Sequence, residues 1–355
     1  MTARLQDSQP VFSAARSVTD SVSALVGNTP LLRLPRLSEL TGCEILAKAE
    51  FMNPGGSVKD RTALGIISDA EQAGLLKPGM TIVEGTAGNT GIGLAMIGRS
   101  RGYSTLIVMN ETQSKEKVDL LRAYGAEVRR VTVAPYTDPG NYNHVARRLA
   151  ESLPSGFWAN QFDNLANRRA HYLTTGPEIW NQTEGSVTDF VSGLGTGGTI
   201  AGVSQALKER NPKVRVTLAD PYGASMWSHF KYGNLDHDEG DSITEGIGQA
   251  RITQNTAGAL VDDCYRFADS VIIEMLYHLR NVEGLCLGSS SAINVCGAVR
   301  TALKYGPGQT IVTILCDGGA RYLSKLFNPE WLTAQNLVVR GLSDEELIRE
   351  ISRVE

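Results

Sequence analysis

The sequence predicts an α/β protein with parallel-rich sheets flanked by helices. Short apolar runs of strand length alternate along the chain with helical patterns, and the connections between them are short and rich in glycine. Around residues 80–109, a strand pattern, a glycine-rich loop, a helical pattern and a second strand follow one another. This order requires parallel strands joined by a right-handed crossover. Its repetition favours sheets covered by helices.

The first half of the chain is expected to begin with a loosely held polar arm over residues 1 to about 20. Apolar runs then alternate with helical spacing, and glycines stand where helices should stop, at Gly74, Gly102 and Gly125. The patterns predict strands at 31–34, 44–50, 80–84, 105–109 and 127–133, and helices at 59–74, 92–101 and 115–124.

The second half repeats the same order. A strand at 189–192 leads into a glycine-rich loop at 195–199, a helix that ends near Glu209 and a strand at 214–218. Residues 310–315 are a continuous apolar run that predicts another strand, and a short charged helix is expected within 343–355. No internal repeat and no low-complexity linker interrupts this order.

Composition excludes several classes of function. The chain has 355 residues, 42% of them hydrophobic, which suffices for two domains with full cores. Its net charge is −4 and it has no basic block, so neither nucleic acid nor a membrane surface is an expected partner. No run of about 18 apolar residues predicts a transmembrane helix, and the polar N-terminus predicts no signal peptide. The five scattered cysteines have no metal-binding spacing, so we expect no metal site and a reducing, cytoplasmic location.

Lys59 is the first candidate catalytic residue. It follows a turn formed by Asn53, Pro54, Gly55 and Gly56, and it stands near the first turn of a predicted helix. The positive end of the helix dipole disfavours a second positive charge, so this amine should lose its proton more easily. A neutral amine is the form that attacks a carbonyl or aldehyde. Taken alone, however, a solvated surface lysine is the simpler interpretation.

Three loops fall at the carboxyl ends of predicted strands, where ligands bind in such folds: 85–91, 195–199 and 317–319. The loop 195–199 has the residues of a phosphate cradle, because its glycines let backbone N–H groups approach an anion and its hydroxyls donate. It is neither a dinucleotide fingerprint nor a P-loop, and a tight strand–helix turn is an equal alternative. The loop 86–91 offers donors for a carboxylate or a ring hydroxyl, although an ordinary turn explains the same residues.

Together these loops resemble the fold-type II pyridoxal-phosphate enzymes of the cysteine synthase and cystathionine β-synthase family, which have the tryptophan synthase β-like fold. The resemblance runs from Leu25 to about Pro329. Its motifs stand in the family's order: Gly27–Leu31, Asn53–Arg61, Ala87–Gly91, Gln161-Phe162, Gly195–Thr199, Glu245–Gly248 and Arg321-Tyr322.

The resemblance implies pyridoxal 5′-phosphate as the cofactor. Lys59 would bind it covalently and later take the Cα proton of the substrate. Asn89 would bond the ring hydroxyl and Ser290 would face the pyridine nitrogen. The cofactor phosphate would lie in a cradle formed by Gly195, Thr196, Gly197, Gly198 and Thr199.

The resemblance also implies a substrate site and a domain arrangement. A small amino-acid substrate would be held through its carboxylate by Thr86, Ala87, Gly88, Thr90 and Gln161. Residues 1–51 and 165–355 would form a large cofactor-binding domain. Residues 52–164 would form a small domain that closes when substrate binds. The family usually forms homodimers.

Two departures from the family pattern bear on the reaction. Ala87 stands where cysteine synthases usually have serine, and Ser290–Ala292 replaces the usual Ser-Ser-Gly. With Asn110–Ser114 and Cys316-Asp317, these features are most similar to the branch that contains bacterial L-cysteine desulfhydrases. We therefore expect a lyase that converts L-cysteine into hydrogen sulfide, pyruvate and ammonia. The alternatives are a cysteine synthase, which joins O-acetylserine and sulfide, and a non-catalytic relative that binds a partner.

Overall fold

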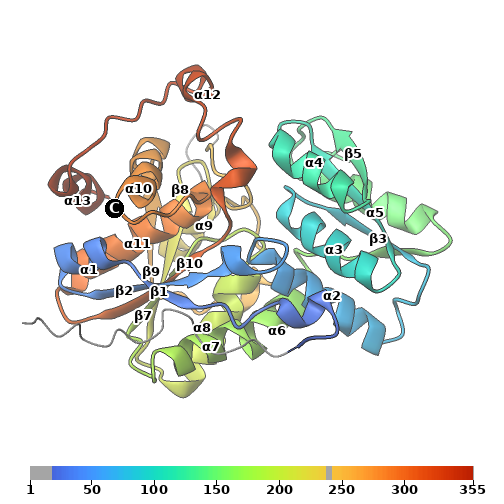
Figure 1. Cartoon of the computed structure of the whole chain (residues 1–355), viewed down its shortest axis with the longest axis horizontal. Coiled ribbons are helices and arrows are strands. Elements are labelled where there is room, and N and C mark those ends of the chain that lie inside the picture. The colour runs from blue at the N-terminus through green and yellow to red at the C-terminus, as the bar shows by residue number, and fades with distance from the viewer. Residues whose placement is uncertain (1–17, 237–241, 355) are drawn as a thin grey trace, which may run out of the picture.

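The chain folds around two separate sheets. The computed structural model describes residues 18–236 and 242–354, so most of the polar arm expected at residues 1 to about 20 lies outside it. A six-stranded sheet has the strand order β1-β2-β10-β7-β8-β9, and a four-stranded sheet has the order β5-β4-β3-β6. In Figure 1 the larger sheet and its helices lie on the left and the smaller sheet on the right.

The strands confirm the predicted fold class. Every described pair of neighbouring strands is parallel except β1 and β2, which are antiparallel. The strands are β1 (Leu31–Arg33), β2 (Glu44–Ala49), β3 (Thr81–Gly85), β4 (Ser104–Asn110), β5 (Glu127–Val131), β6 (Gly156–Trp158), β7 (Asp189–Ser192), β8 (Arg215–Pro221), β9 (Asp263–Phe267) and β10 (Thr310–Leu315). Two of them, β6 and β9, have no strand prediction, and both lie at an edge of their sheets.

Helices cover both faces of each sheet. They are α1 (Pro35–Thr41), α2 (Lys59–Gln72), α3 (Asn89–Ser100), α4 (Lys115–Ala123), α5 (Tyr142–Ser152), α6 (Ala166–Leu173), α7 (Thr175–Gln182), α8 (Gly198–Arg210), α9 (Met226–Tyr232), α10 (Asp269–Asn281), α11 (Ser289–Tyr305), α12 (Pro329–Ala334) and α13 (Asp344–Ser352). Helices α1, α10, α11 and α13 share one hydrophobic core with the larger sheet, and α7 and α8 share the other. Helices α3 and α4 pack on one face of the smaller sheet and α5 on the opposite face.

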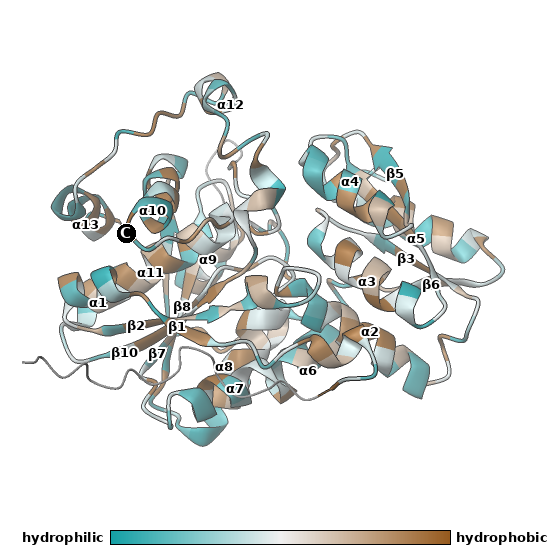
Figure 2. Ribbon diagram, in the orientation of Figure 1, coloured by the Kyte–Doolittle hydropathy of each residue, from teal (hydrophilic) through white to brown (hydrophobic). Residues whose placement is uncertain are grey.

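Hydrophobic residues concentrate on the strands and on the helix faces turned toward them (Figure 2). Within 18–236 and 242–354, no helix is both long and apolar enough to cross a membrane. All four strands of the smaller sheet lie within 52–164, and all strands of the larger sheet lie outside that range. The exact domain boundaries and the closure of the small domain stay predictions.

A buried ion network holds the first turn of α2 against the larger sheet. Arg61 donates from Nε to Oε2 of Glu50 at 2.8 Å and from Nη1 to Oε1 of Glu178 at 2.7 Å. Lys48 Nζ lies 2.6 Å from Glu178 Oε2. Burial by itself raises the pKa of Glu50, but Arg61 outweighs burial and holds that pKa below its usual value. The network therefore joins α2, β2 and α7 through buried ion pairs.

We predict that Arg61→Met lowers the free energy of unfolding by about 3–5 kcal/mol, because it leaves the fully buried Glu50 carboxylate without its partner. Urea unfolding followed by far-UV circular dichroism measures this change. Arg147→Gln is the matched control, since Arg147 and Glu151 form a pair on the surface of α5 with both side chains 58% exposed. The control should shift stability by less than about 0.5 kcal/mol. Equal effects of the two substitutions would contradict a special role for the network.

Candidate active site

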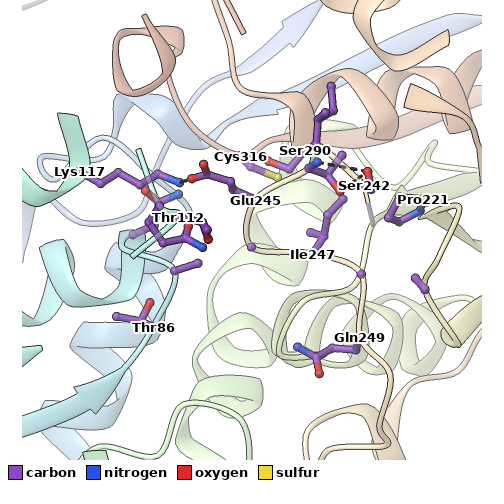
Figure 3. Close-up of a pocket in the computed structure, with 18 of the residues that line it drawn as sticks. Thr86, Thr112, Lys117, Pro221, Ser242, Glu245, Ile247, Gln249, Ser290 and Cys316 are labelled. Atoms are coloured by element: carbon purple, nitrogen blue, oxygen red, sulfur yellow. Dashed lines mark hydrogen bonds and ion pairs between the residues drawn. The ribbon is translucent and has the colours of Figure 1, made fainter. Parts of the chain in front are cut away.

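A cavity of about 580 Å³ opens between the two sheets and is lined by residues from both. Figure 3 shows Thr86 and Lys117 on the side of the smaller sheet, and Ser290, Cys316 and Ile247 on the side of the larger one. The predicted site residues that line this cavity are Lys59, Thr86, Ala87, Asn89, Thr90, Gln161, Thr196 and Ser290. An adjoining recess shares Lys59 and Thr196 and adds Gly195, Gly197 and Thr199.

Gly88 and Gly198 are the two predicted residues that line neither the cavity nor its recess. A Cβ on Gly88 would lie 2.7 Å from Cδ of Lys117, and one on Gly198 would lie 2.2 Å from Oδ1 of Asn167. Both positions therefore serve close packing of the loops. The fold thus brings the sequence-predicted residues together at one place, eleven of them on the surface of the cavity and its recess.

Lys59 is the first residue of α2 and reaches both the cavity and the recess. The loop before it is fixed to the end of β10, because the Val58 N–H donates to the Cys316 carbonyl at 2.9 Å. Burial lowers the pKa of Lys59 below 10.5, while Cys316 and Asp317 partly oppose that shift. The sequence pattern suggested only the helix dipole as a cause. In the structure the first cause is burial, which also lowers the pKa, as expected. The amine is neutral at a lower pH than an exposed lysine.

The loop Gly195–Thr199 packs so tightly that only glycine fits at its centre. Gly197 has φ +87°, and a Cβ there would lie 2.5 Å from Thr256 Oγ1. A Cβ on Gly195 would lie 2.1 Å from the Gly246 carbonyl oxygen. Helix α8 begins at Gly198, so its first N–H groups face the recess that this loop lines. Such a helix start with glycines and hydroxyls fits a phosphate group.

The second loop runs directly into α3. The predicted start of this helix at Ile92 is late, because Asn89 and Thr90 already form its first turn. The Thr90 hydroxyl donates to Oε1 of Gln161, and Gln161 Nε2 donates to the Gly85 carbonyl at 2.9 Å. Gln161 therefore holds the loop in place. The helix start directed at the cavity favours a negatively charged group such as a carboxylate.

Asn89 is held by two residues of the segment that follows β10. Its Nδ2 donates to Oδ2 of Asp317 at 2.7 Å, and Arg321 donates to its Oδ1. The hydroxyl of Tyr322 also donates to Asp317 Oδ2, at 2.6 Å. Asn89 thus connects a loop of the smaller sheet to the larger sheet. Its contact with a ring hydroxyl stays a prediction.

Sequence reasoning missed an ion bridge across the mouth of the cavity. Glu245 Oε2 lies 2.6 Å from Lys117 Nζ of α4, and its Oε1 lies 2.5 Å from Lys325 Nζ (Figure 3 shows the Lys117 pair). Gln113, with its amide nitrogen turned toward acceptors, donates to Glu245 Oε2 and to the Ala87 carbonyl, each at 3.1 Å. Lys117 is only 1% exposed although its amphipathic helix is typical of a surface helix. The one signal in the sequence was the motif Glu245–Gly248, for which no role was predicted.

Comparison with known proteins agrees with this geometry. A family model described as "Pyridoxal-phosphate dependent enzyme" matches residues 22–317. The chain belongs to this family. The cofactor is therefore pyridoxal phosphate, and the cradle and Lys59 have the form that its phosphate and aldehyde require.

Two relatives and two solved structures of this pyridoxal-phosphate dependent enzyme family are similar over most of the chain. Cysteine synthase 1 of Neurospora crassa is 55% identical over 92% of this chain and 88% of the relative. Cysteine synthase 1 of Emericella nidulans is 54% identical over 92% and 89%. A hydrogen sulfide-producing enzyme from Fusobacterium nucleatum has a TM-score of 0.78 and 35% identity over 86% of this chain and all of that one. An O-acetylserine dependent cystathionine β-synthase from Helicobacter pylori has a TM-score of 0.79 and 33% identity over 87% and 99%.

The expectation of an L-cysteine desulfhydrase is wrong. Curated relatives that are 46–55% identical over more than nine-tenths of the chain are named cysteine synthase. That expectation rested on Ala87 and on the similarity to the desulfhydrase branch. In the structure, Thr86 and Thr90 keep their hydroxyls on the cavity wall, and Ala87 is bound through its backbone carbonyl. The absence of a serine hydroxyl at position 87 therefore takes away only one of several polar groups.

We predict that Gly197→Ala weakens retention of pyridoxal phosphate by about tenfold or more, because a Cβ would collide with Thr256 and strain a left-handed backbone. Equilibrium dialysis followed by absorbance measures the loss. Gly102→Ala is the control, since Gly102 has φ +81° and nothing within 4 Å of an added Cβ. It should cost some stability and leave cofactor retention unchanged. Equal cofactor loss in both variants would count against the cradle.

A second prediction concerns the pH at which Lys59 reacts. The rate at which pyridoxal phosphate attaches covalently to cofactor-free protein should rise with pH and reach half its maximum below pH 10.5, because burial lowers the pKa of Lys59 and the neutral amine attacks. Stopped-flow visible absorbance follows the attachment, and Lys59→Arg supplies the blank. A half-maximum at or above 10.5 would show that the amine is not perturbed.

Proposed function

We propose that this chain is a cysteine synthase, which replaces the acetate group of O-acetylserine by sulfide. The observation that carries the proposal is the name shared by relatives that are 55% and 54% identical over 92% of the chain. The geometry supports it, because a lysine with a lowered pKa, a glycine-rich loop that fits a phosphate and a helix start that would favour a carboxylate all line one cavity and its recess. The intact Lys59 and cradle give no support to a non-catalytic role.

The chain's own residues would act as follows. The bound cofactor withdraws electrons from the substrate Cα and so makes its proton acidic. Lys59, displaced from the cofactor by the substrate amine, would take that proton at Nζ. Acetate leaves Cβ, hydrosulfide adds to Cβ, and the proton returns to Cα from Lys59. Thr86, Ala87, Gly88, Thr90 and Gln161 would fix the substrate carboxylate throughout.

Ser290 supports replacement at Cβ over transamination. It lines the cavity near the start of α11, and the family resemblance implies that it faces the pyridine nitrogen. A serine hydroxyl does not protonate this nitrogen as an aspartic acid would, so the ring is a weaker electron sink. Charge at Cα is then released by prompt loss of the β-substituent.

We also propose that the enzyme is a cytoplasmic homodimer. All five cysteines are free thiols, which supports a reducing compartment. The dimer is the usual form of the resembled family. Light scattering coupled to size-exclusion chromatography tests the assembly, and a single species of monomer mass would contradict it.

We predict that purified enzyme forms cysteine from O-acetylserine only when sulfide is present, and that this rate exceeds release of pyruvate from L-cysteine by at least tenfold. Lys59→Ala should abolish cysteine formation, because the covalent attachment and the base are lost together. Lys77→Ala removes an exposed lysine and is the control. Cysteine and pyruvate are measured in parallel. A protein that retains its cofactor but makes no sulfide-dependent cysteine would overturn the proposal.

A further inference from the structure

Two fully buried residues of α6 contact the two hydroxyls of the phosphate cradle. Asn167 and His171 are both 0% exposed and stand four residues apart, so they lie on one face of the helix. That face packs against α8, which follows the cradle. Close approach is possible because α8 has glycine there: a Cβ on Gly202 would lie 2.4 Å from the Arg168 carbonyl oxygen. Neither Asn167 nor His171 lines the cavity or its recess, so both act through the residues that do.

Asn167 fixes the direction of the hydrogen bond at Thr196. Its Nδ2 donates to the Gln161 carbonyl at 2.9 Å and to Thr196 Oγ1 at 2.8 Å. Its Oδ1 accepts the hydroxyl proton of Thr62 at 2.8 Å. The amide nitrogen must face the Gln161 carbonyl, which only accepts, so Thr196 Oγ1 is an acceptor toward Asn167. Within the described residues, no protein group accepts the Thr196 proton, which is left for a ligand in the recess.

His171 makes the equivalent contact at Thr199. Its Nε2 lies 3.2 Å from Thr199 Oγ1, and its Nδ1 lies 2.9 Å from Thr175 Oγ1. Burial, followed by the nearby charges of Arg61 and Lys59, lowers the pKa of His171 well below 6.5, so the ring is neutral. The neutral tautomer with its proton on Nδ1 would donate to Thr175 and take up the Thr199 hydroxyl proton at Nε2. The tautomer with its proton on Nε2 instead accepts from Thr175 and donates to Thr199. The Thr199 hydroxyl then has its own proton free for an anion.

We propose that Asn167 and His171 are positioning residues that turn the hydroxyl protons of Thr196 and Thr199 into the recess and so prepare it for a phosphate group. This inference rests on the cofactor site of the proposed function and deepens it. Asn167 and His171 each donate to a lone pair on the hydroxyl oxygen of one threonine. The two hydroxyls then meet the phosphate as donors without first breaking a hydrogen bond to the protein.

The test compares two ligands that differ only in the phosphate. Pyridoxal phosphate and pyridoxal are titrated separately into cofactor-free protein, and affinity is measured by visible absorbance. His171→Phe should weaken pyridoxal phosphate binding roughly tenfold or more, the scale of one hydrogen bond to a charged group, and leave pyridoxal binding unchanged. His171→Gln, whose amide nitrogen can donate to Thr199, should recover most of the affinity. His278→Phe replaces another buried histidine, on α10, and should change neither ligand.

A mutant cycle separates positioning from simple packing. Because His171 acts through Thr199, His171→Phe added to Thr199→Val should cost little more than either change alone. His171→Phe added to Thr196→Val should be close to additive. Circular dichroism and urea midpoints show which variants are folded. If His171→Phe does not fold, Asn167→Asp tests the same idea at Thr196, because a carboxylate there accepts the Thr196 proton instead of donating.

The measured affinities distinguish a positioning role from a packing role. Unchanged pyridoxal phosphate affinity in folded His171→Phe, or in folded Asn167→Asp, overturns the positioning role. Equal losses for pyridoxal and pyridoxal phosphate, or full additivity with Thr199→Val, also overturn it and leave a packing role. Wild-type protein that binds both ligands equally would overturn the cradle itself and with it the cofactor site of the proposed function. A wild-type preference for the phosphate that survives His171→Phe removes only the positioning role.

Discussion

The buried pairing of Arg61 with Glu50 is the constraint on which the site depends. Helix α2 packs along α3 and α6, but its first turn is held at the end of β2 by this pair and by Glu178 of α7. Lys59 lies two residues before Arg61, so the same contact sets where its amine can reach. Separating two charges at 2% and 0% exposure would leave both without water. The lysine is therefore placed by groups that have no role in the chemistry.

Local patterns predicted much of the fold and most of the candidate site. Glycine-rich turns between apolar runs located eight strands and the two loops, 85–91 and 195–199, that line the cavity and its recess, because strand ends and turns are encoded within a few neighbouring residues. The boundaries were less certain. Helix α3 begins at Asn89, three residues before its predicted start, and the side chains of Asn89 and Thr90 bond to Asp317 and Gln161, which lie far away in the sequence. Residues 156–158 and 263–267 were not predicted as strands: the first has only three residues, and the second places the charged Asp263 and Arg266 among its apolar residues.

Contacts between residues that lie far apart in the sequence have no local sequence pattern that would predict them. Glu245 meets Lys117 across 128 residues of sequence, and Asn167 meets Thr196 across 29. A lysine on an amphipathic helix and an asparagine near a helix start each have an ordinary local explanation.

The choice between desulfhydrase and synthase failed for a related reason. Elimination and replacement both begin by breaking the Cα–H bond and the bond from Cβ to its leaving group. The substrate loop, which includes Ala87, therefore carries little information about whether a nucleophile then adds to Cβ.

The ion bridge at the mouth gives the cavity two different responses to acidity. Burial raises the pKa of Glu245, but Lys117 and Lys325 outweigh burial and bring it below 4.5. Because the pKa of this carboxyl is lowered, its pairing stabilises the folded form above the usual carboxyl pKa, and that contribution is lost as pH falls through the lowered value. Lys59 inside changes charge below 10.5. The bridge carboxylate therefore keeps its charge over the pH range in which the buried Lys59 amine loses its proton.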